Sequence, residues 1–389
     1  MRKSITAAIL CSLTLAGSAL AQAAATPLQV RTYPGTTLYP YPLDSVRGVQ
    51  GLLVPNTAMI NAGPGPVTVA TVEFDLLRGT DVIETRTLYA SDLDRSAKGG
   101  VGLQASGMIE AVDFLFGDVL GKPAAKLAGS ATLAPGEGLL ISNQVFAWSG
   151  KRDAMIIIAR SANGAVLGQV RTALTTAPPE PRYIWPLQGL SYAAAGPSFN
   201  THHRWAAPEA FAFDIVRVTD GTQTHHGDGM VFTDYAVYGA PIRAAAEGEV
   251  VAVVAGEAED PAQFRRPGES AEVYFGRIQE WQAAGLARGA AFLAGNYIVI
   301  RHPWGEFSLY AHMKPASARV RVGQAVKAGD IIGEVGSSGS PTEPHLHFQV
   351  CDAPGPLDCV GRPIGFKGVE VPTAMLPGAI QSGDIVEAR

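Results

Sequence analysis

Cysteine is scarce in this 389-residue chain, and its basic residues form no stripe or cluster. Cys11 lies in an apolar N-terminal stretch, which leaves Cys351 and Cys359 on either side of a turn-rich segment. Neither has the charged surroundings that activate a thiol, so a cysteine nucleophile is not expected. In an oxidising compartment such a pair favours a disulfide, and two free, buried thiols are the alternative. Without clustered Lys and Arg, nucleic acid is not an expected partner.

Several familiar catalytic motifs are missing as well. The sequence has no Gly-x-x-x-x-Gly-Lys-Ser/Thr phosphate loop and no His-Glu-x-x-His pair. These absences exclude P-loop NTPases and thermolysin-like proteases. Gly336–Ser340 resembles part of a nucleophile elbow, but the pattern fails at Ser340 and lacks the strand-to-helix context. There is also no long coiled-coil heptad region of the kind that regulatory proteins often carry.

The N-terminal segment has the pattern of a signal peptide. Arg2 and Lys3 precede an apolar stretch from Ile5 to Gly17, and Ala19-Leu-Ala21 is a small-residue cleavage site. The apolar stretch is short for a membrane span, so an uncleaved anchor is the less favoured alternative. We therefore expect residues 1–21 to be removed. The mature protein is expected to be exported, to the periplasm or the medium, without a transmembrane anchor.

The remaining chain is predicted to be mainly β and to consist of two halves. Its 44 glycines and 27 prolines favour many turns and short strands. Residues 26–174 show period-two alternation and turn clusters, which predict an immunoglobulin-like β-sandwich without assigned chemistry. A Pro-rich linker at 175–185 leads into a second domain at 186–372, and 373–389 is expected to be a C-terminal tail.

The second half is again rich in strand-like segments. We predict strands at 211–216, 249–254, 296–300 and 306–310, where β-branched and aromatic residues are enriched. Within an insertion at about 255–294, the apolar spacing from roughly Glu269 to Leu293 is helical. This insertion is expected to rim the site, and a surface excursion is the alternative.

Two histidines in one predicted strand are the strongest indication of chemistry. His345 and His347 are two positions apart, so their side chains share one face of the strand. That arrangement suits one metal ligand and one acid or base, although a pair of surface histidines is the alternative. Asp214 interrupts an apolar strand, where a carboxylate is costly unless it is paired, exposed or metal-bound.

Other histidines lie at positions from which they could join them. His202 and His203 are on a loop about a dozen residues before Asp214, and His312 ends a predicted strand. A catalytic zinc site needs three protein ligands and one open position, drawn from separate parts of the chain. The remaining histidines are expected to be surface residues: His225, His226 and His302.

Residues 196–350 resemble the lysostaphin-type, or LytM-like, zinc endopeptidases. The matching segments occur in the family's order: Tyr238–Val250, Gly295–Ile300, Tyr310–His312, Val322–Asp330, Ile332–Gly339 and Pro344–Phe348. The resemblance implies a small antiparallel β-sheet or half-barrel with a metal in a groove. It also implies cleavage of peptide bridges in bacterial peptidoglycan.

The resemblance implies a role for five residues. His203, Asp214 and His347 match the family's Zn²⁺ ligands, whereas His312 and His345 match its catalytic histidines. All five positions are filled, as expected of an active enzyme. Zinc held there would activate water, and an imidazole would act as general base.

Two departures from the family leave alternatives open. The interval between His203 and Asp214 is longer than in the family's usual pattern, and His202 remains an alternative first ligand. The insertion at 255–294 bears on the substrate, which could be a Gly-Gly bridge, a diaminopimelate cross-link or a non-wall protein. The alternative function is a non-catalytic module that binds the cell wall or activates another wall hydrolase.

Overall fold

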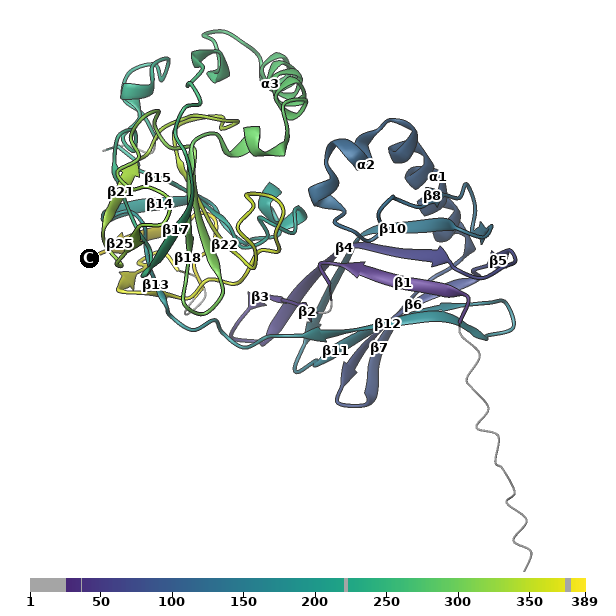
Figure 1. The fold of residues 1–389 in the computed structure, drawn as a ribbon. Helices are drawn as coiled ribbons and strands as arrows, with labels where there is room; N and C mark the ends of the chain where they lie inside the picture. Colours follow the sequence, from purple (N-terminus) through teal and green to yellow (C-terminus); the bar gives the residue numbers. More distant parts are fainter. Residues whose placement is uncertain (1–25, 36, 220–222, 375–378) are drawn as a thin grey trace, which may run out of the picture.

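The computed structural model describes residues 26–35, 37–219, 223–374 and 379–389 (Figure 1). The signal peptide predicted at 1–21, including Cys11, lies outside these ranges. Strands far outnumber helices, which confirms a mainly β protein. Within the described ranges, no helix is both long and apolar enough to cross a membrane.

The first half contains two five-stranded sheets packed face to face. One sheet consists of β1 (Leu28–Tyr33), β3 (Tyr41–Asp44), β4 (Val49–Asn61), β8 (Lys126–Leu127) and β10 (Glu137–Ser149). The other consists of β2 (Thr37–Leu38), β6 (Thr71–Arg78), β7 (Asp81–Leu88), β11 (Ala154–Arg160) and β12 (Val166–Leu174). A short pair, β5 (Val67–Thr68) and β9 (Thr132–Leu133), lies beside them. Met59, Phe74 and Ile157 are fully buried between the sheets. The immunoglobulin-like type of this sandwich stays a prediction.

Helices interrupt this half where only strands and turns were expected, so that part of the prediction was wrong. They are α1 (Ala90–Ala105), α2 (Met108–Ala111) and the 3₁₀ turn η1 (Asp113–Leu115). The side of α1 that faces the sheet buries Leu93, Ala97 and Gly100, at helical spacing. Few large apolar residues mark this face, and three glycines lie in the helix, so its pattern is weak in the sequence.

The second half is built on a nine-stranded sheet, in which every pairing is antiparallel. The spatial order is β20-β17-β18-β19-β22-β15-β14-β25-β24. These strands are β14 (Gly189–Ala195), β15 (Phe213–Val216), β17 (Gly248–Val254), β18 (Tyr297–Arg301), β19 (Phe307–Ala311), β20 (Ala325–Val326), β22 (Leu346–Cys351), β24 (Val369–Glu370) and β25 (Ile385–Ala388). Two small sheets pair β13 (Tyr183–Ile184) with β23 (Phe366–Lys367), and β16 (Pro241–Arg243) with β21 (Ile331–Glu334). The antiparallel sheet confirms the expected fold class. Residues 385–388, assigned to a C-terminal tail, form β25 and pair with β14 instead.

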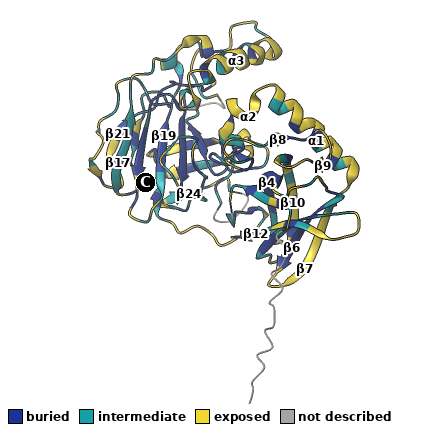
Figure 2. Ribbon diagram, turned by 45° about the vertical axis from the view of Figure 1, so that its right-hand side comes forward, coloured by how far each residue is buried: buried dark blue, intermediate teal, exposed yellow. Residues whose placement is uncertain are grey.

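The segment between β17 and β18 carries the longest helix of this half. It contains η4 (Pro261–Gln263), α3 (Ala271–Leu286) and η5 (Ala290–Ala294). Ser270 caps α3, since its side chain accepts a hydrogen bond from the Val273 amide. Figure 2 shows that α3 exposes one face to solvent. Leu286 at its end packs against the apolar cluster around α2 of the first half.

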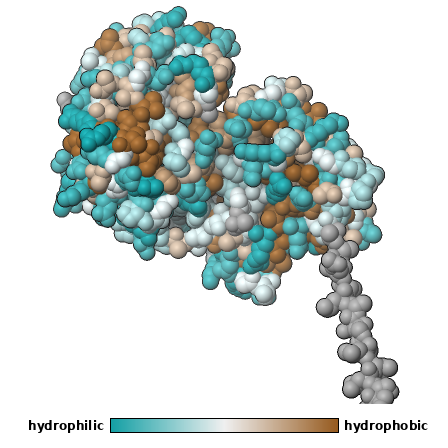
Figure 3. Space-filling model, viewed as in Figure 1, coloured by the Kyte–Doolittle hydropathy of each residue, from teal (hydrophilic) through white to brown (hydrophobic). Residues whose placement is uncertain are grey.

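The two halves therefore touch. In the space-filling view, they form one continuous surface with a notch at the top, on which hydrophilic and hydrophobic residues are intermixed (Figure 3). Direct hydrogen bonds join the halves as well: Arg362 Nη1 donates to the Tyr39 hydroxyl over 2.5 Å. Further short 3₁₀ turns are η2 (His202–Trp205) and η3 (Phe232–Asp234).

His302 is buried, with 2% of its surface exposed, and the prediction that it lies at the surface was wrong. Its Nδ1 lies 2.7 Å from the Glu247 carbonyl oxygen, and its Nε2 lies 2.9 Å from the Ser308 hydroxyl. Because both ring nitrogens have partners, burial is tolerated. Those partners are distant in sequence or across a turn, so the local loop context gave no sign of them.

Candidate metal centre

The centre is built on three neighbouring strands, β15, β22 and β19. Asp214 of β15 lies directly opposite His347 of β22 in the register, and His347 lies opposite Ala311 of β19. His312 is the next residue after β19, so it emerges beside the same spot. Antiparallel pairing thus brings together residues that are more than a hundred positions apart in the chain.

Four imidazoles surround the Asp214 carboxylate, which is only 9% exposed. Oδ1 lies 3.1 Å from His347 Nδ1 and 3.3 Å from His345 Nε2. Oδ2 lies 3.3 Å from His203 Nε2 and 3.9 Å from His202 Nε2. Burial opposes ionisation, but His203 and His345 together hold the pKa of Asp214 well below its usual value.

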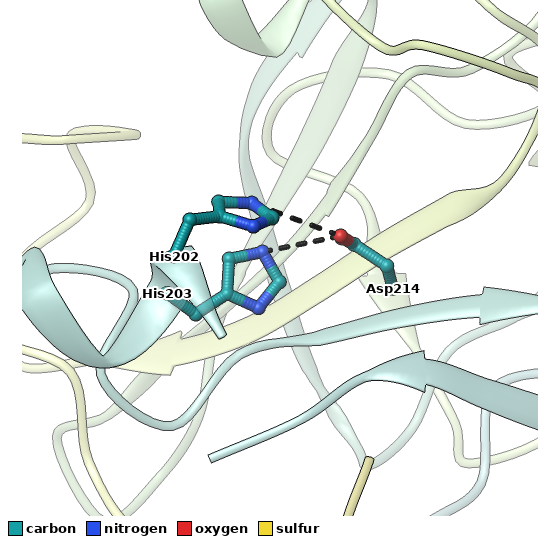
Figure 4. A group of neighbouring side chains, drawn as sticks. All are labelled: His202, His203 and Asp214. Carbon is teal, nitrogen blue, oxygen red and sulfur yellow. Dashed lines mark ion pairs between the residues drawn. The ribbon is translucent and has the colours of Figure 1, made fainter. Parts of the chain in front are cut away.

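Two adjacent histidines of η2 are candidates for the first metal ligand. His202, His203 and Asp214 each offer a ligand atom, and these atoms all lie within 4.8 Å of one another (Figure 4). The two imidazoles differ in burial, because the His202 side chain is 72% exposed and that of His203 only 1%. The buried imidazole is the better candidate for a water-excluded ligand, so our preference for His203 remains the proposal.

His312 is held in an unusual backbone conformation. Its φ of 58° lies in the left-handed region, which non-glycine residues rarely adopt. Its backbone N–H donates to the Ala294 carbonyl over 3.0 Å, and its carbonyl accepts from the Gly336 amide over 3.1 Å. Its Nδ1–H donates to the Ser338 carbonyl over 2.9 Å, which leaves Nε2 as an acceptor. Burial lowers the pKa of His312 well below its usual value, so the ring is neutral.

The insertion supports the turn that orients His312. Glu259 Oε1 accepts the Ser337 backbone N–H over 2.7 Å. Gln263 Nε2 donates to the Ser337 hydroxyl over 2.5 Å. Since Ser337 precedes the residue whose carbonyl holds His312, the insertion does more than rim the site.

Gln349 is a residue of the centre that sequence reasoning missed. Its Oε1 lies 2.8 Å from His347 Nε2, and its Nε2 donates to the Pro356 carbonyl over 2.8 Å. The bond to Pro356 fixes the orientation of the amide, so His347 donates its Nε2–H and presents Nδ1 to the centre. The signal was available, because Gln349 is two positions beyond His347 and therefore shares its strand face.

The loop that contains Pro356 is closed by a disulfide between Cys351 and Cys359, whose Cα atoms are 5.8 Å apart. This confirms the pairing favoured by the sequence. Cys351 is the last residue of β22, so the loop is tied to the strand that carries His347.

The centre favours positive charge, as a metal site should. Burial disfavours a protonated His347, but the hydrogen bond that its Nδ1–H donates to Asp214 and the charge of that carboxylate outweigh burial and raise the pKa of His347 to about 9. A carboxylate that stabilises a proton at this position would also stabilise a metal cation in its place. One carboxylate and two imidazoles, one of them with an oriented second nitrogen, are a donor set that fits a divalent metal.

Replacing Gln349 with Leu is expected to weaken metal affinity by about 10- to 100-fold, since the outer partner of a ligand histidine is lost. Gln349→Glu keeps an acceptor for His347 Nε2 and should retain most of the affinity. Competition with a chromogenic chelator measures both. Equal affinity in Gln349→Leu and the unaltered protein would contradict this role for the amide.

This fold and this centre define a metallopeptidase domain. Residues 228–359 match peptidase family M23, so this part of the chain is a peptidase M23 domain. The matched region includes His312, His345 and His347, whereas His203 and Asp214 precede it.

Similar proteins include two bacterial enzymes. The chain is 38% identical over 85 residues to the DD-carboxypeptidase/endopeptidase Mpg of Neisseria meningitidis, which covers 22% of this chain and 17% of that protein. It is 36% identical over 81 residues to the peptidoglycan DD-endopeptidase ShyA of Vibrio cholerae, covering 21% and 17%. The chain thus spans less than a fifth of the length of these relatives. The catalytic domain of lysostaphin from Staphylococcus simulans aligns at 20% identity over 45% of this chain and 88% of that domain, with a TM-score of 0.24, too low to support an argument.

Proposed function

We propose that the protein is an exported zinc endopeptidase that hydrolyses peptide bonds of peptidoglycan, in cross-bridges or stem peptides, in the periplasm or outside the cell. The observation that carries the proposal is the buried Asp214 carboxylate, surrounded by imidazoles from separate segments. The family membership of residues 228–359 supports the reaction class. The name of the Vibrio cholerae relative supports peptidoglycan as the substrate.

In this proposal, the residues divide into two groups. The metal ligands are His203, Asp214 and His347. The general acid and base are His312 and His345. A bound Zn²⁺ would polarise the scissile carbonyl and lower the pKa of water at the site.

The two catalytic histidines differ in protonation, which suits opposite tasks. His312 is neutral, and its free Nε2 can accept a proton from the attacking water. His345 donates its Nδ1–H to the Glu343 carbonyl over 2.8 Å, and its Nε2 lies beside Asp214. Burial lowers the pKa of His345, but Asp214 outweighs burial and raises it, which favours this ring over His312 as the acid that protonates the leaving amine.

A non-catalytic wall-binding module is the less favoured function. Such a module needs no histidine poised as a base beside a second histidine poised as an acid. The ring centres of His312 and His345 are 4.7 Å apart, close enough to act on one bond.

Metal removal is the direct test. The purified mature protein should release new amine termini from peptidoglycan, a chelator should stop the release, and added Zn²⁺ should restore it. Mass spectrometry of the products then identifies the bond that is cut. Tight binding to peptidoglycan without release would favour the wall-binding module, and chelator-resistant release would overturn the metal mechanism.

A further inference from the structure

Arg204, next to the proposed ligand His203, is a buried cation. It is 4% exposed, and its guanidinium donates to two carbonyl oxygens. Nη1 donates to Ala210 over 3.2 Å, and Nη2 donates to Tyr39 over 3.0 Å. Burial lowers the pKa of Arg204 to about 10, so the side chain is still charged at neutral pH. A buried charge needs compensation, and here carbonyl dipoles provide part of it.

Three aromatic rings provide the rest. The guanidinium carbon lies 4.7 Å from the ring centre of Phe211, 5.4 Å from that of Phe199 and 5.5 Å from that of Tyr41. These distances are within the range of cation–π attraction. Tyr41 belongs to β3 of the first half, and Tyr39 lies between β2 and β3 of the same half. The Arg204 side chain is therefore held by both halves of the protein.

Anchoring of Arg204 constrains the orientation of η2. In this four-residue turn, His203 and Arg204 are buried, whereas His202 and Trp205 are exposed. With Arg204 fixed among the three aromatic rings, the adjacent His203 is directed toward Asp214.

The His203 ring lies against His202 and His347, with ring centres 4.2 Å and 5.1 Å away. Its Nδ1 is buried and has no hydrogen-bond partner among the residues that the structure describes. Metal-ligating histidines usually donate their second nitrogen to an acceptor that fixes the ring, as Gln349 does for His347. At His203 no such acceptor is found, so the direction of the imidazole depends more strongly on the position of the backbone, which Arg204 holds.

We propose that Arg204 is a positioning residue for the first metal ligand, and that the N-terminal half is a structural part of the metal centre through Tyr39 and Tyr41. The inference rests on the proposed metal site. It gives the first half, to which no catalytic residue is assigned, a role in positioning the first metal ligand. It also explains how a histidine separated from Asp214 by a long loop can face it reproducibly.

The test measures metal affinity on the full-length, metal-free protein, by titrating Zn²⁺ or Co²⁺ against a chromogenic chelator. Arg204→Met keeps a long apolar stem but loses the two hydrogen bonds and the charge, and it should bind metal about 10- to 100-fold more weakly, as for other lost ligand supports. Arg204→Lys keeps the charge without the flat, forked head and should be intermediate. Tyr41→Leu, which changes only the first half, should weaken binding in the same direction. Its effect should not add to that of Arg204→Met.

Arg86→Met is the matched control. Arg86 likewise donates to a carbonyl oxygen, that of Val145, and lies over an aromatic ring, that of Phe146, but both contacts are within the first half, so its replacement should leave metal affinity unchanged. Unaltered affinity in folded Arg204→Met, or an equal loss in Arg86→Met, would overturn the inference. If Arg204→Met does not fold, Tyr41→Leu decides by itself. Metal affinity is read without substrate, so a protein that binds metal but leaves peptidoglycan intact would refute the proposed function and not this role of Arg204.

Discussion

Asp214→Asn is expected to abolish both metal binding and peptidase activity. The substitution preserves the size of the side chain but removes the only carboxylate among the proposed ligands. Losing a Lewis acid worth several kcal/mol corresponds to a fall in turnover of about 10³-fold, because each 1.4 kcal/mol is tenfold. Metal content by atomic spectroscopy and turnover on peptidoglycan, measured on one sample, check this result.

Asp352→Asn is a suitable control for that variant. Asp352→Asn is the same chemical change in the same half of the protein. The Asp352 carboxylate, however, pairs with Arg362 and does not belong to the centre. It should keep full metal content and activity. An Asp214→Asn protein that holds a full complement of metal would rule out the proposed ligand set.

His312→Ala is expected to lower turnover sharply without loss of the metal, and so to separate metal binding from catalysis. Its imidazole belongs to the catalytic pair and not to the ligand set, so metal content should stay complete. Turnover should fall by about 10²- to 10⁴-fold, the usual contribution of a general acid or base. Because the backbone at this position is left-handed, His312→Asn is a useful second variant, since Asn tolerates that conformation and still cannot act as the base.

Loss of metal from both His312 variants would mean that the residue is a ligand, and full activity in either would remove it from the mechanism. His226→Ala, at an exposed histidine outside the centre, controls for the removal of an imidazole. The contrast between Asp214→Asn and His312→Ala is the sharper result, because only the first should lose the ion.

Several strands of the second half could be predicted because their signals are local. β-Branched and aromatic residues mark β15 and β19, which carry part of the centre, and the spacing of His345 and His347 places both on one face. The path of the loop before Asp214 could not be read in this way. We infer that its course depends on the contacts of Arg204 with Tyr39 and Tyr41 of the first half, and contacts between residues so far apart leave no periodic pattern in the sequence.

Other features were missed for different physical reasons. The helix α1 has a narrow apolar face and several glycines, so its helical period is faint. His302 was misjudged because its burial depends on partners that a turn and a neighbouring strand supply. In each case, burial of the residues depends on contacts with distant parts of the chain, and a local sequence pattern does not report such contacts.

The central position of β22 has a consequence for misfolded chains. The strand is paired on both sides, with β15 and β19, and it alternates buried Phe348 with His347. A slip of one residue would exchange the two faces, moving the imidazole into the core and the phenyl ring into the metal centre. A correctly aligned sheet and a complete centre therefore form together, so the specific activity of a preparation should report directly on its fraction of native molecules.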